Sequence, residues 1–170
     1  MTVQYRVAAA GDLAPTDLYA ILRLRIDVFV VEQRAAYADI DGRDIEPGAE
    51  LVWAHEDGVV LSTARVLLEP GGMRIGRVAT AETARSRGVA SEIMRRSIDR
   101  CRERDAGAAI ELDAQKQLVD WYGRFGFAVC GDEYLEDGIP HLPMRLLPLQ
   151  PTTTDGVDPS ADRVPHGATG

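Results

Sequence analysis

The chain has 170 residues, of which 45% are hydrophobic and 27% are charged, and its formal net charge at pH 7 is −8. Its length fits a single domain with one hydrophobic core, and its acidic excess argues against a nucleic-acid partner, because binding to phosphates needs a basic surface. No run of about 20 apolar residues is present and the N-terminus lacks a signal-peptide pattern, so we expect no membrane contact and a cytoplasmic location.

Short strand-like and helix-like patterns alternate along the chain and indicate a mixed α+β fold. We expect strands at residues 4–9, 51–56, 59–68, 73–80, 108–113, 127–130 and 141–147, and helices at 15–33, 88–102 and 115–125. The first helical stretch is expected to break in two before Gln33. Asp57-Gly58 predicts a tight hairpin turn, because both residues of such a turn need positive φ angles.

Residues 150–170 are rich in Thr, Asp, Gly and Pro and have few large apolar side chains. Such a segment cannot offset its ordering entropy by burial. We therefore expect one domain at residues 1–149, followed by a flexible tail at 150–170.

Cys101 and Cys130 are far apart and stand near no metal-ligand spacing, so neither a zinc site nor a disulfide is expected. We interpret both cysteines as buried small apolar residues. Four aromatic residues fall within apolar patterns and are also assigned to the core, namely Trp53, Trp121, Phe125 and Phe127.

The sharpest local signal is the loop Arg85-Ser86-Arg87-Gly88-Val89-Ala90, between an expected strand and an expected helix. Such a loop directs backbone N–H groups and the positive end of a helix dipole at one point. Gly88 lets the backbone approach a bulky anion, and Ala90 is small enough for close packing. Arg85 and Arg87 add positive charge. The pattern predicts an anion site, with a polar helix-capping loop as the alternative.

A dinucleotide-binding fingerprint matches this loop less well. The first glycine of Gly-x-Gly-x-x-Gly is missing, and no acidic ribose ligand follows a second strand. The hairpin ahead of the loop also indicates an antiparallel sheet at this point.

The loop matches the Gln/Arg-x-x-Gly-x-Gly/Ala motif of the GNAT superfamily of N-acetyltransferases at Arg85, Gly88 and Ala90, and the chain resembles that family. A second stretch, residues 115–127, is similar to the family motif in which a Tyr precedes a Gly-Phe pair by four residues. The chain also resembles the ElaA-like subgroup through four segments, at residues 24–33, 39–42, 76–78 and 136–141. The resemblance covers roughly residues 15 to 147.

This resemblance implies a central, mostly antiparallel sheet of 6–7 strands, flanked by about four helices and splayed between residues 73–80 and 108–114. It also implies acetyl-CoA as the cosubstrate, with the pantetheine inserted in the opening like an extra strand. Backbone groups of Val78, Ala79 and Thr80 would bond the pantetheine and polarise the thioester carbonyl. The pyrophosphate would be held by Arg85, Ser86, Arg87, Gly88, Val89 and Ala90, and Gln115, where the family often has Asn, would contact CoA.

Direct transfer of an acetyl group to an amine needs a deprotonated amine, donors for the developing oxyanion and a proton source for the thiolate. It needs no metal and no enzyme nucleophile. Tyr122 is the candidate acid, because an unperturbed tyrosine pKa of about 10 keeps it protonated at neutral pH. A packing role for Tyr122 is the alternative.

The general base is less clear, because six residues could face the acceptor: Glu32, Asp39, Asp41, Glu111, Asp113 and His141. We favour Glu32 or His141, since histidine can carry protons near neutral pH. A water relay, or a structural role for His141, is the alternative.

The expected acceptor is an amine of a small molecule or of a protein. A helical set, Arg23, Arg25, Glu32 and Gln33, could form part of the acceptor wall or be a solvated face. Two acidic clusters could attract a cationic amine or be ordinary charged loops: Asp39, Asp41, Asp44, Glu46 and Glu50, and Asp132, Glu133, Glu136 and Asp137.

Two other functions compete with an acetyltransferase. One is an acyl-CoA sensor or regulatory module of the same fold, against which the presence of Tyr122 argues. The other is an acyl-homoserine lactone synthase, which residues 28–33 resemble, although those enzymes are longer and need an S-adenosylmethionine pocket. The oligomeric state is left open, with a homodimer as one option.

Overall fold

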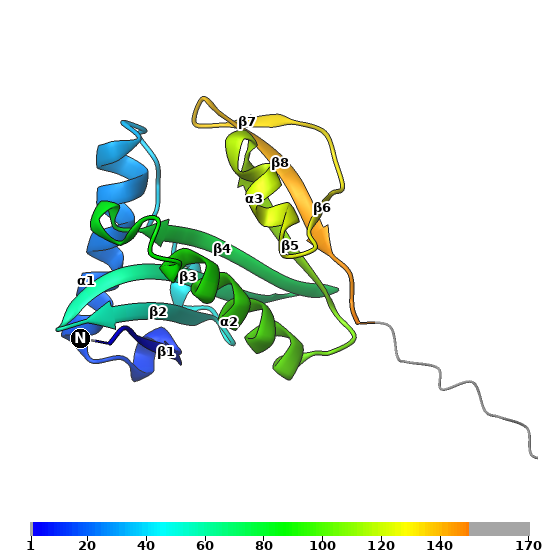
Figure 1. Cartoon of the computed structure of the whole chain (residues 1–170). Helices are drawn as coiled ribbons and strands as arrows, with labels where there is room; N and C mark the ends of the chain where they lie inside the picture. The colour runs from blue at the N-terminus through cyan, green and yellow to red at the C-terminus, as the bar shows by residue number, and fades with distance from the viewer. Residues whose placement is uncertain (1, 150–170) are drawn as a thin grey trace, which may run out of the picture.

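The computed structural model describes residues 2–149, which form one open sheet with helices on both faces (Figure 1). The strands are β1 (Gln4–Ala8), β2 (Glu50–Glu56), β3 (Val59–Glu69), β4 (Gly72–Thr80), β5 (Ala109–Gln115), β6 (Ala128–Val129), β7 (Tyr134–Glu136) and β8 (Ile139–Leu146). The α-helices are α1 (Pro15–Ile26), α2 (Val89–Arg104) and α3 (Val119–Gly123). The other helical segments are the π-helical η2 (Asp27–Glu32) and four single 3-10 turns, η1 (Ala10–Asp12), η3 (Arg43–Ile45), η4 (Glu82–Ala84) and η5 (Lys116–Leu118). The tail expected at residues 150–170 lies outside the described residues.

The strands follow the order β1-β2-β3-β4-β5-β8-β6, and β7 pairs with β8. Every pairing is antiparallel except that of β4 with β5. The predicted α+β fold with a mostly antiparallel sheet is therefore confirmed. The sheet has eight strands in place of 6–7, because β7 and β8 form a hairpin that the sequence patterns did not predict. Its turn, Asp137-Gly138, has positive φ angles of 48° and 80°, as Asp57-Gly58 has 50° and 79° in the predicted hairpin.

Residues 15–32 form one continuous helix, so the expected break into two helices is wrong. α1 begins at Pro15, whose fixed φ suits the first helical turn, and passes directly into the π-helical η2. The Gln33 N–H donates to the Val28 carbonyl at 3.3 Å, which closes the wider turn. Within residues 2–149 the α-helices therefore number three in place of about four. The helix expected at 115–125 is shortened to η5 and α3, because β5 continues as far as Gln115.

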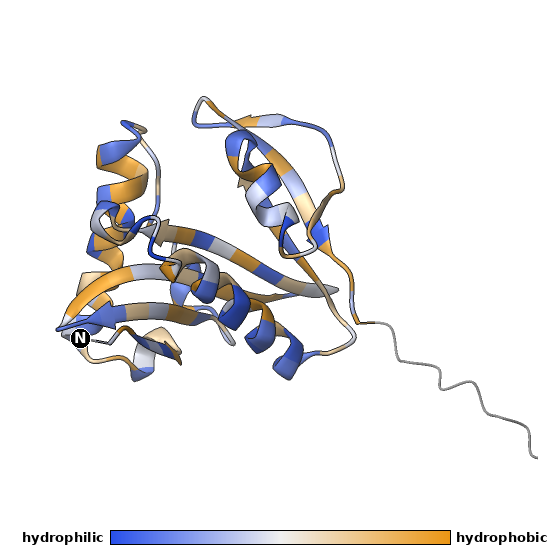
Figure 2. Cartoon of the chain, viewed as in Figure 1, coloured by the Kyte–Doolittle hydropathy of each residue, from blue (hydrophilic) through white to orange (hydrophobic). Residues whose placement is uncertain are grey.

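The two faces of the sheet are covered by different helices, because side chains along a strand alternate between the faces. Val52 packs with Ile93 of α2 on one face, and Leu51 and Trp53 pack with Ile21 of α1 on the other. Figure 2 shows hydrophilic residues along the outer side of α2. The core thus packs the central strands between α1 and α2.

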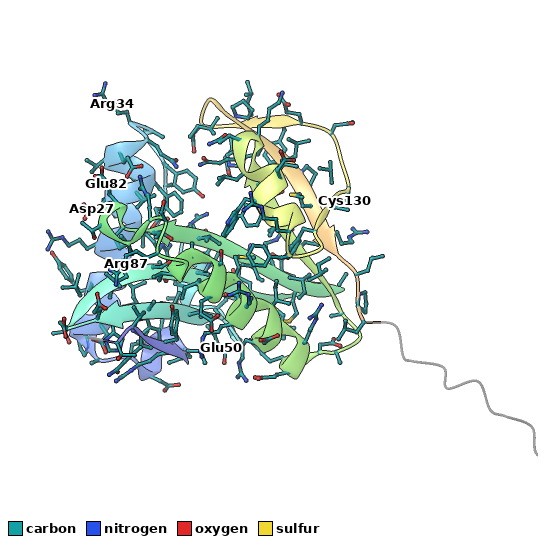
Figure 3. All side chains as sticks on the ribbon, in the orientation of Figure 1. Asp27, Arg34, Glu50, Glu82, Arg87 and Cys130 are labelled. Carbon is teal, nitrogen blue, oxygen red and sulfur yellow. The ribbon has the colours of Figure 1, made fainter. Side chains whose placement is uncertain are left out.

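The cysteine interpretation is only half right. Cys101 is fully buried in α2, whereas Cys130 is exposed and lies beyond the short strand β6 (Figure 3). A two-residue strand at the edge of the sheet has no second layer to bury the residue that follows it. Trp53 and Phe127 are buried as expected, in two different parts of the core, and Trp121 and Phe125 are partly buried against the part that contains Phe127.

β4 and β5 separate along most of their length, which confirms the predicted splay. Their parallel pairing joins residues 72–74 to residues 109–111 and ends there. Beyond it, β4 continues along β3 to Thr80, while β5 continues along β8 to Gln115. The β5–β8 arm therefore leans away from β4, as Figure 1 shows.

Arg74 crosses the short pairing of β4 with β5. Its guanidinium lies 2.9 Å from Glu69 of β3, and 3.3 Å and 2.8 Å from Glu111 and Asp113 of β5. One arginine thus links three strands where the two arms of the sheet meet.

Candidate active site

The opening between β4 and β5 continues into a cleft of about 730 Å³. Eight of the residues predicted for the site line it: Glu32, Val78, Thr80, Arg85, Ala90, Gln115, Tyr122 and His141. The other five do not. The side chains of Ala79 and Val89 are buried in the core, and Ser86, Arg87 and Gly88 lie on the exposed loop before α2.

A β-bulge in β4 shapes the wall of the cleft beside the opening. The register with β3 shifts between Thr63 and Arg65, and Arg77 on the opposite strand adopts a φ of +53°. Bulges of this kind leave backbone groups without a ladder partner and redirect side chains. Val78, next to Arg77, lines the cleft, whereas the Ala79 carbonyl accepts a hydrogen bond from the Ser62 hydroxyl on the β3 side.

The N-terminus of α2 lies at one end of the cleft and has no side-chain cap. The first backbone bond of the helix runs from the Glu92 N–H to the Gly88 carbonyl at 3.1 Å, so the N–H groups of residues 89–91 have no partner within the helix. Gly88 precedes the helix with a φ of +78°, and a Cβ there would meet no atom within 4 Å. Unsatisfied N–H groups and the helix dipole make this end a suitable anion site.

The two arginines of the loop are already ion-paired. Arg85 lies 2.6 Å from Glu32 and also donates to the Thr80 carbonyl. Arg87, which is labelled in Figure 3, lies 2.9 Å from Glu56. Hydrogen bonding to Glu32 is the main factor that raises the pKa of Arg85. Both pairs are partly exposed, so each is weak and exchangeable with another anion.

Tyr122 lies on α3 and is buried against aromatic neighbours. Its ring makes edge contacts with Trp121 at 4.9 Å and Phe127 at 6.4 Å. Burial raises the pKa of Tyr122 well above the ordinary tyrosine value. The hydroxyl therefore stays protonated and can act as a donor in the cleft that Tyr122 lines.

His141 lies on β8, opposite Gln115 of β5 and Tyr134 of β7. Its Nδ1 is 2.8 Å from the Ile139 carbonyl, and because a carbonyl only accepts, Nδ1 carries the proton of the neutral ring. Nε2 is then the basic nitrogen, and it lies 3.7 Å from a carboxylate oxygen of Glu136. The imidazole also stacks on Tyr134 at 5.8 Å. This geometry is suitable for a proton acceptor.

Four of the other candidate bases are bound to arginines. Asp39, Asp41, Glu111 and Asp113 contact Arg25, Arg65, Arg145 and Arg74, respectively, at 2.6 to 2.9 Å. Burial alone would raise the pKa of Asp41, but hydrogen bonds from Arg65 and the Arg43 N–H hold it well below its usual range. Asp41 is therefore a poor proton acceptor, and the other three carboxylates are each occupied by an arginine side chain.

The first acidic cluster predicted to attract an amine is neutralised within the fold. Arg25 is fully buried and bonds both Asp39 and Asp44 at 2.9 Å and 2.6 Å. Glu46 and Glu50 pair with Arg43 and Arg100, respectively. Arg25, assigned to a possible acceptor wall, is therefore a structural residue instead.

Gln115 and Gln33 join the two walls of the cleft, since the Gln115 side-chain amide donates to the Gln33 side chain at 3.1 Å. Sequence reasoning missed Tyr37, which also lines the cleft and whose ring lies 4.7 Å from the Arg77 guanidinium. Tyr37 stands in an irregular loop, where no periodicity indicates which way a side chain points.

The sequence matches a family model described as an acetyltransferase (GNAT) domain over residues 22–148. A UPF0039 protein of Mycobacterium tuberculosis is 38% identical over 149 residues, which cover 85% of this chain and 93% of that protein. Protein ElaA of Escherichia coli is 36% identical over 139 residues, which cover 79% of this chain and 90% of that protein.

Solved structures agree with these relatives. The crystal structure of an acyl-CoA N-acyltransferase from Pseudomonas aeruginosa has a TM-score of 0.81 at 36% identity and covers 85% of this chain and 99% of that chain. The crystal structure of Escherichia coli ElaA also has a TM-score of 0.81, at 31% identity and the same coverage. The resemblance inferred from the motifs is confirmed. Within residues 2–149, no helix is both long and apolar enough to cross a membrane.

Proposed function

Because the chain belongs to the GNAT acetyltransferase family, we propose that it transfers the acetyl group of acetyl-CoA to an amine within a ternary complex. The observation that carries this proposal is the open edge of β4 next to the uncapped N-terminus of α2. An open strand edge can bond the amides of an extended chain such as pantetheine. A helix N-terminus can bind a diphosphate.

The residues that would hold acetyl-CoA lie on these two features. Val78 and Thr80 line the cleft on β4, but the Ala79 carbonyl already bonds Ser62 and the Thr80 carbonyl already bonds Arg85, so Val78 is the best candidate for a pantetheine contact. The pyrophosphate would contact the loop from Arg85 to Ala90, through backbone N–H groups first. Gln115 would approach from the opposite wall.

In the proposed reaction the amine nitrogen attacks the thioester carbonyl carbon directly. A C–N bond forms, the C–S bond breaks, and the electron pair of that bond leaves with the thiolate. Starting from an ammonium, the nitrogen loses two protons. The thiolate takes up one proton and the other goes to solvent.

Two side chains of the cleft have suitable properties for these proton transfers. Tyr122, which burial keeps protonated, would donate to the thiolate and be reprotonated from solvent. His141 Nε2 would accept a proton from the amine, because the Ile139 carbonyl holds the proton of the neutral ring on Nδ1. We propose His141 rather than Glu32 as the base, since Glu32 already pairs with Arg85 at 2.6 Å.

The proposal is tested by titrating the protein with CoA in a calorimeter and by following thiol release from acetyl-CoA with a panel of polyamines, amino acids and peptides. Binding of CoA, with thiol release on at least one amine, is expected. Binding without release on any amine would favour an acyl-CoA sensor. No binding of CoA would contradict the proposal.

A further inference from the structure

The carboxylates that line the cleft differ in whether a basic side chain neutralises them. Four of them pair with arginines, namely Glu32, Asp41, Glu69 and Asp113. Glu136 and Asp137 line the same cleft, and within residues 2–149 neither has a lysine or arginine at ion-pair distance. The uncompensated negative charge of the cleft is therefore concentrated at one place.

That place is the β7–β8 hairpin, where Glu136 ends β7 and Asp137 begins the turn. Figure 1 shows the hairpin rising on one side of the molecule and the end of η2 rising on the other. Residues of both lie along the cleft, since Phe29 and Glu136 both line it. The hairpin thus forms the wall that faces the end of the α1–η2 helix.

A second, independent observation points to a ligand beside Glu136. The side chain of His141 is only 9% exposed, yet it lines the cleft. Its Nδ1 is satisfied by the Ile139 carbonyl, while the 3.7 Å from Nε2 to Glu136 is too long for a hydrogen bond. A buried basic nitrogen and a carboxylate therefore face the same space without bonding each other.

The opposite wall is aromatic. Phe29 and Tyr37 make an edge contact at 6.0 Å, and both line the cleft. Burial raises the pKa of Tyr37, Arg77 lowers it, and the negative charge of Glu136 raises it again. Phe29 and Tyr37 therefore form an aromatic face in the same cleft that Glu136 lines.

We propose that the acceptor is a primary alkylammonium held between Glu136 and His141, with its apolar body against Phe29 and Tyr37. This inference rests on the proposed acetyl transfer. His141 Nε2 takes one proton from the ammonium and so frees the lone pair that attacks the thioester carbonyl carbon. Glu136 attracts the cation on arrival and then stabilises the imidazolium that forms next to it.

Two isomeric amines separate this acceptor class from other amines. 2-Phenylethylamine is an alkylamine and is protonated at neutral pH, whereas 4-ethylaniline is neutral, because its nitrogen lone pair is delocalised into the ring. The measurement is the ratio of kcat/KM for 2-phenylethylamine to that for 4-ethylaniline. A ratio is not altered by partial misfolding of a variant, which lowers both values equally.

The wild-type protein is expected to prefer 2-phenylethylamine, and Glu136→Gln is expected to lower the ratio about tenfold through loss of a charge-assisted contact. The control is Glu133→Gln, which removes the same charge from a residue that pairs with Lys116 at 2.6 Å and does not line the cleft. Its ratio is expected to stay within about twofold of the wild-type value, as surface charges contribute little.

Each other outcome has a definite meaning. A preference for 4-ethylaniline, or an unchanged ratio in Glu136→Gln, would overturn the proposed acceptor class. Binding of CoA with turnover of neither isomer would also overturn it, while leaving the CoA site standing. No binding of CoA would contradict the proposed function itself.

Discussion

The carboxylate of Glu32 lies 2.6 Å from the guanidinium of Arg85, and this contact joins the end of η2 to the loop before α2. Both residues were predicted for the site, one as a base and one as a phosphate ligand, and the fold instead pairs them with each other. The pair is partly exposed, so it can open when another anion competes for Arg85.

Removal of the Glu32 carboxylate, which pairs with Arg85, should favour CoA binding. In Glu32→Gln we expect the Kd for CoA to fall about two- to fivefold, the range of an exposed ion pair, with kcat changed by less than about twofold. Calorimetry and thiol release measure the two quantities. Glu82→Gln is the matched control, because it removes a charge from the neighbouring η4 that makes no ion pair with Arg85 within residues 2–149, and so isolates the direct contact of Glu32. A large fall in kcat at constant Kd would instead identify Glu32 as the base.

The anion site predicts a specific loss at Gly88. In Gly88→Glu the new side chain would extend into the open space in front of the α2 amides and bring a like charge, so the Kd for CoA should rise about tenfold or more. Gly71→Glu is the control, because Gly71 also has a positive φ and open space around its Cα, but lies in the β3–β4 turn. Equal effects of the two substitutions would mean that backbone strain, not the anion site, is responsible.

Tyr122→Phe separates catalysis from packing. Phenylalanine keeps the ring contacts with Trp121 and Phe127, so we expect an unchanged Kd for CoA but a kcat lowered about 10²-fold. Tyr19→Phe, at an exposed position, is the control for loss of a hydroxyl. A Tyr122→Phe enzyme with the kcat of the wild type would assign Tyr122 to packing alone.

The buried Arg25 cluster predicts a large loss of stability. Arg25→Met would remove the arginine that joins the buried Asp39 and Asp44 and leave each with a single ion pair, to Arg77 and Arg65, respectively. The free energy of unfolding should then fall by about 3–5 kcal/mol. Arg23→Met, two residues earlier, breaks only an exposed pair with Asp27 at 3.8 Å and should change it by less than about 0.5 kcal/mol. Urea denaturation measures both. Similar values for the two variants would contradict a structural role for Arg25.

Asp41 predicts an acid-dependent part of the stability. Its pKa is lower in the folded chain than the ordinary value of about 3.9, so its contribution is complete above about pH 4 and is lost as the pH falls through the folded pKa. The difference in unfolding free energy between the wild type and Asp41→Asn should therefore be largest near neutral pH and shrink below about pH 4. A difference that grows in acid would reverse the assigned sign.

Local patterns were enough to predict most of the fold, because they are decided by neighbouring residues. Asp57-Gly58 fixes its hairpin by its own φ angles, and the alternation in β2 is sufficient to divide Leu51 from Val52 between the two faces. The β7–β8 hairpin carried the same Asp-Gly signal but has only three residues in β7, too few for a visible alternation.

The partners of charged residues could not be predicted in this way. Arg25 and Asp44 are 19 residues apart, and Glu32 and Arg85 are 53 apart. Their contacts depend on how the α1–η2 helix and the following loop pack on the sheet, which no local pattern records. The sequence pattern therefore allowed a free acidic surface at residues 39–50, whereas arginines neutralise most of these carboxylates in the fold.

The parallel pairing of β4 with β5 spans three residues on each strand, with Arg74 across it, and this is the main backbone seam between the two halves of the sheet. An extended ligand bound along the exposed edge of β4 would lengthen the backbone pairing between the two halves of the sheet. Ligand binding and the stability of the contact between the halves are therefore thermodynamically linked. The melting temperature should then climb with the concentration of the ligand. A rise in melting temperature would show, without any measurement of turnover, that the ligand spans the opening between β4 and β5.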